Sequence, residues 1–267
     1  MKKKLLSLLF IPTLLLCSCK GAKITEEKAK ELANKIVANE DALEGKGTEI
    51  NVTFKDNKNN VTYQLITDKN ENVKFKAKGK ADDESLDFVI YTVKSEEHEE
   101  VSFIKDYSQE TKTYSEHVYS KKETPEYSAL VGVYSKQAIV PLLMVANFAD
   151  PVKILEIDEY KNGEYYDDGV TYNNKAEYFS TGERNLTIEI TQKYVSGEPI
   201  VEEGEEKEDE YSKDMKLTIT YDNLVLKSVN ATAKSSKGNN GSIKATVNIN
   251  NSLKVELPKN WKDLLNK

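Results

Sequence analysis

Apolar and polar residues alternate along most of the chain, and this alternation predicts strands. Ile50, Val52 and Phe54, for example, are separated by polar residues, and runs rich in Asn and Asp interrupt the pattern at intervals. Short runs with a period of two, joined by turn residues, are typical of an antiparallel meander. We therefore expect about six strands between residues 49 and 120. One of them, residues 86–93, is apolar on both faces and should be covered on both.

The second half of the chain returns to the same period. An Asn162-Gly163 pair is a strong hairpin signal, so we expect a strand on each side of it. The strands predicted in this half are residues 152–160, 165–172, 176–180, 186–190, 215–221, 224–231, 243–249 and 253–257. Residues 260–266 are expected to form a terminal helical turn with Trp261 against the core.

Residues 24–39 have a different period, which predicts a helix. Thr25 is a suitable N-cap, and Glu26 and Glu27 follow in the first turn, where they complement the helix dipole. Apolar residues then recur at intervals of three and four, which gives the helix one apolar face. We expect this face to pack on the sheet.

The most apolar stretch of the mature chain, residues 136–150, lies between the two β-rich halves. It is too short to cross a bilayer, which requires about 20 residues of helix, and it has no polar face. We expect residues 126–150 to form two helical pieces or one bent helix, with a break at Pro141. The residues predicted to fill the sheet and to line a hydrophobic site are Ile139, Leu142, Leu143, Met144, Val145 and Phe148.

Together these elements predict an α+β fold that is mostly β. The expected architecture is a large curved antiparallel sheet, an open half-barrel, with the N-terminal helix and the central apolar helical segment on its concave side. Both halves have the same composition and no Pro- or Gly-rich linker separates them, so we expect one domain over residues 24–267.

The N-terminus has the pattern of an export signal. Lys2, Lys3 and Lys4 precede an apolar run over residues 5–16, and a cysteine follows at position 19. The sequence Leu16-Cys17-Ser18-Cys19 resembles the lipobox of bacterial lipoproteins. This resemblance implies a signal peptide over residues 1–18 and a lipidated tether over 19–23. It also implies that Cys19 carries acyl chains such as palmitate and anchors an extracytoplasmic protein to the bacterial cell membrane.

Composition narrows the classes of function. Residues 1–18 carry three of the lysines, so their removal changes the formal net charge from −7 to −10. Such an acidic protein is a poor candidate for nucleic-acid binding. Cys19 is the only cysteine of the mature chain, which excludes disulfides and cysteine nucleophiles. The only arginine is Arg184. Bidentate binding of a carboxylate or phosphate by a guanidinium group is therefore nearly unavailable.

No motif for catalysis or for metal binding stands out. The two histidines, His98 and His117, have no histidine or cysteine at ligand spacing. The sequence contains no G-x-S-x-G elbow and no Gly-rich phosphate loop. The acidic run over residues 202–210 is expected to be a solvated hairpin tip, because a calcium loop would need a different spacing. We therefore expect no enzyme activity, no cofactor and no metal.

The order of the elements is an amphipathic helix, a long meander, an apolar helical insertion and a second run of strands. This layout resembles the LolA/LppX-type lipoprotein-carrier superfamily. The resemblance implies an open half-barrel that wraps helices and holds a lipid or another hydrophobic ligand on its concave face. The alternative is a surface-displayed structural or interaction lipoprotein with a filled core, which meets a protein partner and has no small-molecule ligand.

Overall fold

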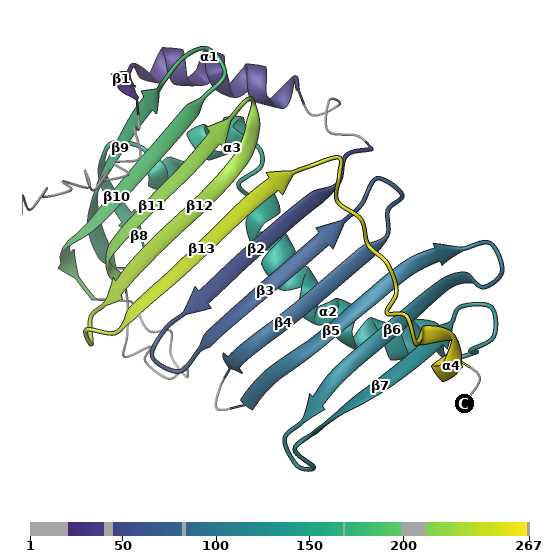
Figure 1. The fold of residues 1–267 in the computed structure, drawn as a ribbon. Coiled ribbons are helices and arrows are strands. Elements are labelled where there is room, and N and C mark those ends of the chain that lie inside the picture. Colours follow the sequence, from purple (N-terminus) through teal and green to yellow (C-terminus); the bar gives the residue numbers. More distant parts are fainter. Residues whose placement is uncertain (1–20, 40–44, 82–83, 168, 199–211, 266–267) are drawn as a thin grey trace, which may run out of the picture.

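The computed structural model of the protein describes residues 21–39, 45–81, 84–167, 169–198 and 212–265. Most of them belong to one open antiparallel sheet of 13 strands, with the neighbour order β1-β9-β10-β11-β12-β13-β2-β3-β4-β5-β6-β7, and β8 also pairs with β9. The sheet does not close into a barrel, and the helices α1, α2 and α3 accompany it (Figure 1). This architecture confirms the predicted mostly β, α+β fold with a curved open sheet.

The two halves of the chain form adjacent parts of this sheet. The strands of the first half are β2 (Thr48–Lys55), β3 (Asn60–Thr67), β4 (Val73–Ala81), β5 (Glu84–Ser95), β6 (Glu99–Ser108) and β7 (Thr113–Ser120). The other strands are β1 (Ala22–Ile24), β8 (Gly163–Asp167), β9 (Val170–Ser180), β10 (Leu186–Gly197), β11 (Ser212–Asp222), β12 (Val225–Ser235) and β13 (Asn240–Ile249). The halves join where β13 pairs with β2, with Ala245 opposite Val52.

The N-terminal helix α1 (Glu26–Val37) is confirmed together with its cap. The backbone N–H of Lys28 donates to Thr25 Oγ1 (3.3 Å), and the apolar face, including Leu32 and Ile36, is buried. Residues 22 and 23 differ from the expected tether and Ile24 from the expected helix, because all three form β1 and pair with β9, where Ile24 lies opposite Tyr178. The chain is therefore part of the sheet from residue 22 onward.

The central apolar stretch forms one helix, α2 (Tyr127–Ala146), which runs diagonally across the sheet on its concave face (Figure 1). The helix continues through Pro141, so the alternative of two helical pieces is wrong. A proline removes only one intrahelical hydrogen bond, and tertiary packing can hold the remaining turns together.

The predicted strand over residues 152–160 is wrong. This segment forms the short helix α3 (Pro151–Glu156) and the 3-10 helix η2 (Asp158–Tyr160). Asp150 caps α3, since its side chain accepts from the N–H groups of Val152 and Lys153, and Pro151 occupies the first turn. An Asp-Pro pair at these positions is a helix start, and here it outweighs the β-branched residues that follow it.

Two further predictions in the second half are wrong. The hairpin does not turn at Asn162-Gly163, because β8 begins at Gly163 and pairs with β9, with Asp167 opposite Val170. The Asn162 side chain instead accepts from the N–H of Ala176 (2.8 Å). Residues 253–257 form no strand but an extended segment, and it leads to the predicted terminal helix, α4 (Trp261–Leu265).

The buried side chains form two apolar clusters. The first joins α1, α3 and the strands β9 to β13, and its fully buried members include Leu32, Ile188 and Ile219. The second lies on β4, β5 and β6 and contains Phe75, Ala77, Phe88, Ile90 and Ile104. The acidic run over residues 202–210 lies outside the described residues.

Candidate functional site

The surface beneath α2 is a floor of aromatic rings contributed by neighbouring strands. Tyr63 on β3 stacks on Phe75 of β4, with ring centroids 6.1 Å apart, and Phe75 lies 5.7 Å from Phe88 of β5. Phe88 meets Tyr134 of α2 edge-on at 5.2 Å. The rings share one face because these residues are in register across the strands, with Tyr63 opposite Ala77 and Ala77 opposite Phe88. Burial raises the pKa of the Tyr63 hydroxyl.

Two tyrosine hydroxyls fix the N-terminal half of α2 to the sheet. The Tyr127 hydroxyl donates to Glu100 Oε1 (2.6 Å) and lies 2.7 Å from Ser102 Oγ. About two turns further on the same side, the Tyr134 hydroxyl donates to Asp106 Oδ2 (3.1 Å). Burial is the main cause that raises both tyrosine pKa values, to about 12 for Tyr134, and the neighbouring carboxylates add to it. Both phenols are therefore neutral donors at ordinary pH.

The C-terminal end of α2 is fixed in a different way. Val145 is 5% exposed and belongs to the first apolar cluster, and Phe148 packs against the same cluster. The hydroxyl of the fully buried Tyr221 on β11 donates to the Phe148 carbonyl oxygen (2.6 Å). Burial raises the pKa of this phenol. The helix is thus held at both ends across the concave face.

The residues predicted to line a hydrophobic site do not share one side of α2. Val145 and Phe148 face the core, whereas Leu143 is 57% exposed. Val133 is also 59% exposed, so α2 has an apolar side that is open to solvent. The side chains of Ile139, Leu142 and Met144 lie outside the described set.

Sequence reasoning missed the aromatic floor and the tyrosine contacts. Tyr63, Phe75 and Phe88 occupy the same phase of the period-two pattern in three consecutive strands, so their common face could have been found. Register depends on the turns between the strands, however, and the pairing of Tyr127 with Glu100 and Ser102 depends on where the helix crosses.

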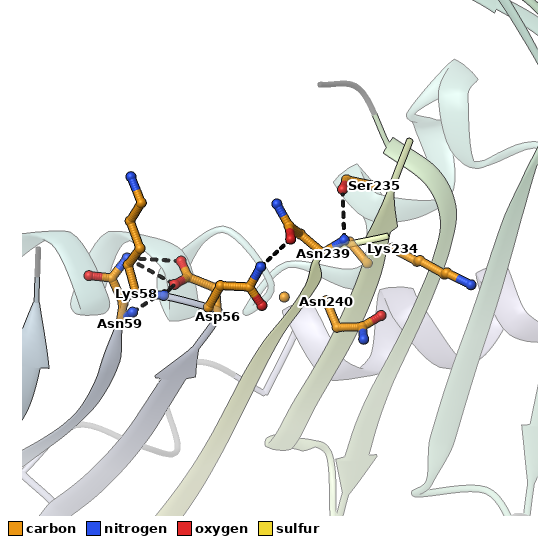
Figure 2. Close-up of a pocket in the computed structure, with 10 residues that line it drawn as sticks. Asp56, Lys58, Asn59, Lys234, Ser235, Asn239 and Asn240 are labelled. Carbon is orange, nitrogen blue, oxygen red and sulfur yellow. Dashed lines mark hydrogen bonds between the residues drawn. The ribbon is translucent and has the colours of Figure 1, made fainter. Parts of the chain in front are cut away.

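A polar pocket of about 370 Å³ lies at one end of the sheet, between the β2–β3 and β12–β13 turns (Figure 2). Asn57 Nδ2 donates to Asn239 Oδ1 and so connects the two turns. The Asp56 carboxylate accepts from the Asn59 side-chain amide (2.9 Å), which is the main cause of its lowered pKa, and also from the N–H groups of Lys58 and Asn59. The carboxylate therefore holds its own turn and is poorly placed to bind a ligand.

A larger open pocket of about 770 Å³ adjoins it along the ends of β10 to β13. Four lysines line it: Lys55, Lys193, Lys216 and Lys234. Two of its acidic neighbours, Asp56 and Asp214, partly balance this charge. The pocket is wide and open and charged side chains line it, so it suits a hydrated ligand better than an acyl chain.

His98 is 7% exposed although it lies in a charged turn. Its Nδ1 lies 3.2 Å from Glu123 Oε1, and its ring meets Trp261 of α4 edge-on at 5.9 Å. The contact explains why His98 is buried, since its ring packs against the C-terminal helix, whereas Glu96 and Glu97 of the same turn are exposed. Across the described ranges, no three His, Cys, Asp or Glu side chains come together as a metal site.

Comparison with known proteins found no relative of this chain. No family model matches the chain, and no curated protein is detectably similar to it in sequence. No helix within the described part of the chain is both long and apolar enough to cross a membrane.

Proposed function

We propose that this protein is an exported lipoprotein, anchored to a bacterial cell membrane through Cys19, that binds a hydrophobic ligand between α2 and the concave face of the sheet. The observation that carries the proposal is an apolar helix laid over a floor of aromatic rings and held at its two ends by tyrosine hydroxyls. The lipobox-like sequence Leu16-Cys17-Ser18-Cys19 supports the anchor.

The chemistry of the floor favours an acyl chain as the ligand. Phe75, Phe88 and the aliphatic side chains clustered with them offer dispersion contacts and no hydrogen bonds to a polar group. The helix that covers the floor has one charged residue, Lys136, among the 20 from Tyr127 to Ala146. A saturated acyl chain that binds between such surfaces is removed from water, and no polar group becomes unsatisfied as a result.

The second candidate is an interaction lipoprotein with a filled core. Val145 and Phe148 pack directly into the first cluster, and Tyr134 contacts Phe88, which favours a helix that acts as core. In that case the exposed apolar residues Val133 and Leu143 would meet a protein partner.

Lipid analysis of the purified protein separates these candidates. The mature chain with unacylated Cys19 is extracted with organic solvent, and the extract is analysed by mass spectrometry for bound lipid. The same protein is titrated with a fluorescent fatty acid. Bound lipid at near-stoichiometric yield and saturable fatty-acid binding are expected. The absence of both would contradict the ligand proposal and leave the filled core.

The anchor is tested separately. Cells that express the full chain are fed a clickable palmitate analogue, and the protein is compared with its Cys19→Ser variant. Incorporation into the wild type alone is expected. Labelling that survives the substitution would contradict Cys19 as the attachment site.

A further inference from the structure

The chain becomes part of the fold immediately after the proposed lipid anchor. Gly21 has a φ of +83°, and a Cβ atom at this position would lie 2.2 Å from the carbonyl oxygen of Ser180 and 2.6 Å from the backbone nitrogen of Thr181. Only glycine permits such a close approach of two backbones. From Ala22 onward, β1 pairs with β9, with Ala22 opposite Ser180.

This position limits how far the domain can lie from the anchor. Cys19 is two residues before Gly21, and two residues span at most about 7 Å even when fully extended. The start of the β9–β10 turn, at Ser180 and Thr181, is therefore held close to the lipidated residue. A tether this short does not let the domain turn freely above the bilayer.

We propose that the end of the sheet next to Gly21 faces the phospholipid headgroups, so that the protein stands on its membrane in one orientation. This inference rests on the lipidation of Cys19 in the proposed function. The contact surface consists of two turns, residues 181–185 between β9 and β10 and residues 222–224 between β11 and β12, which we call the anchor-side turns.

The anchor-side turns are joined into one unit by hydrogen bonds. The N–H of Leu224 donates to the Arg184 carbonyl oxygen (2.9 Å), and the N–H of Asn223 donates to Asn185 Oδ1 (3.1 Å). Ser180 Oγ donates to the Asn185 carbonyl oxygen (2.7 Å), close to the point where Gly21 packs. A surface already ordered in this way loses little entropy when it meets the headgroups.

The side chains of the β9–β10 turn suit a phospholipid interface. Arg184, the only arginine of the chain, is exposed there, and its guanidinium can donate two parallel hydrogen bonds to a phosphate. Glu183 lies beside it and Thr181 is exposed, so the turn carries no net charge and requires no anionic lipid.

The same orientation directs the opposite end of the sheet away from the bilayer. Strand β12 has 11 residues and joins the anchor-side turn at Leu224 to the β12–β13 turn, so the two ends lie about 36 Å apart. The polar pocket of Figure 2 therefore opens toward the extracytoplasmic space.

Fluorescence quenching in vesicles tests this orientation. The lipidated protein is reconstituted into phosphatidylcholine vesicles that contain a headgroup nitroxide lipid. Two variants each carry one labelled cysteine at an exposed site: Glu183→Cys in the anchor-side turns and Lys58→Cys in the β2–β3 turn. Because Cys19 is the only other cysteine of the mature chain and is blocked by lipid, the labelling is specific. Strong quenching at position 183 and no quenching at position 58 are expected.

A spacer variant provides the matched control. Six Gly and Ser residues inserted between Lys20 and Gly21 should free the domain and reduce the difference between the two labels at least severalfold. Equal quenching at both positions without the spacer, or stronger quenching at position 58, would overturn the orientation alone. Failure of the protein to float with vesicles would overturn the anchor, and with it the orientation that rests on the anchor.

Discussion

The carboxylate of Asp68 accepts a hydrogen bond from the backbone N–H of Val255, 187 residues later in the sequence (3.1 Å). Asp68 lies in the β3–β4 turn and is 4% exposed. It also accepts from the N–H groups of Asn70 and Asn72 and from the Asn72 side chain. One buried side chain thus holds both its own turn and the extended segment that leads to α4.

Asp68→Asn should loosen the C-terminal segment and destabilise the fold. An amide cannot accept at the position now occupied by Oδ2, so the N–H of Val255 and the Asn72 side chain would lose their acceptor. Two unsatisfied buried donors should cost about 2–4 kcal/mol in the free energy of unfolding. Urea denaturation measures this loss, and trypsin should cleave the tail faster. The control, Asp56→Asn in the more exposed β2–β3 turn, should cost less than about 1 kcal/mol.

The Asp68 effect should depend on pH. Burial alone would raise the pKa of this carboxyl, but its hydrogen bonds outweigh burial and hold the pKa below the ordinary value of 3.8. A lowered pKa in the folded state means that the stabilisation is present above the unfolded pKa and is lost as pH falls below it. The stability gap between wild type and Asp68→Asn should therefore be constant above about pH 5 and shrink below pH 3.8. A gap that grows on acidification would contradict the assignment.

Tyr221→Phe should weaken the contact between β11 and the segment that follows α2. The substitution removes a hydroxyl that donates to the Phe148 carbonyl oxygen (2.6 Å) and leaves that partly buried oxygen without this donor. A loss of about 1–3 kcal/mol in the free energy of unfolding is expected. Tyr166→Phe, at a tyrosine that is 64% exposed, serves as the control and should change stability by less than about 0.5 kcal/mol. Equal effects of the two substitutions would be inconsistent with this contact.

Gly79→Ala should disrupt the pairing of β3 with β4. Gly79 has a φ of +147°, and a Cβ atom there would lie 2.0 Å from the Asn60 carbonyl oxygen. Since this neighbour is backbone, the strands must move apart, and a cost of about 2 kcal/mol or more is expected. In α2, a Cβ atom at Gly132 would have no neighbour within 4 Å, so Gly132→Ala should stabilise the protein by up to about 1 kcal/mol. Thermal unfolding of the two variants should shift in opposite directions.

Substitutions on the two sides of α2 should affect ligand binding differently. Val145→Ala, on the buried side, should lower stability by about 1–2 kcal/mol and reduce the amount of lipid that co-purifies. Leu143→Asp, on the exposed side, should leave the stability and the amount of co-purified lipid nearly unchanged. Retention of lipid is measured by mass spectrometry. If Leu143→Asp alone abolishes retention, the ligand lies on the outer side of the helix, contrary to the proposal.

The strand pattern was predictable because period-two alternation reflects one covered face. The runs around Val52, Ile188, Ile219 and Ala245 all lie in strands, and the Thr25 cap and the central helix were recognisable for equally local reasons. Predictions were wrong where a local signal was outweighed by another. Asp150-Pro151 started a helix in a segment that alternates like a strand, and Asn162 used its side chain to bind a neighbouring strand instead of forming a hairpin.

The floor beneath α2 could be predicted only in part. Alternation assigns Phe75 and Phe88 to covered faces, but the identity of the covering element depends on where a 20-residue helix crosses the sheet. The exposure of Leu143 could not be predicted either, since every position of α2 near it is apolar. Sequence hydrophobicity alone cannot decide which side of such a helix meets the sheet.

Because the core is divided into two clusters, different parts of the sheet are expected to unfold locally to different extents. The first cluster depends on α1, the strands β9 to β13 and Val52 of β2, and the second on β4 to β6. Helix α2 reaches both through Val145 and Tyr134, and Tyr63 of β3 packs against both. A domain with two such clusters can unfold in one part before the other. Amide hydrogen exchange then shows two levels of protection. Helix α2 is the only described helix with residues packed in both clusters, so loosening it should let the half with β4 to β6 fluctuate while the other half stays protected.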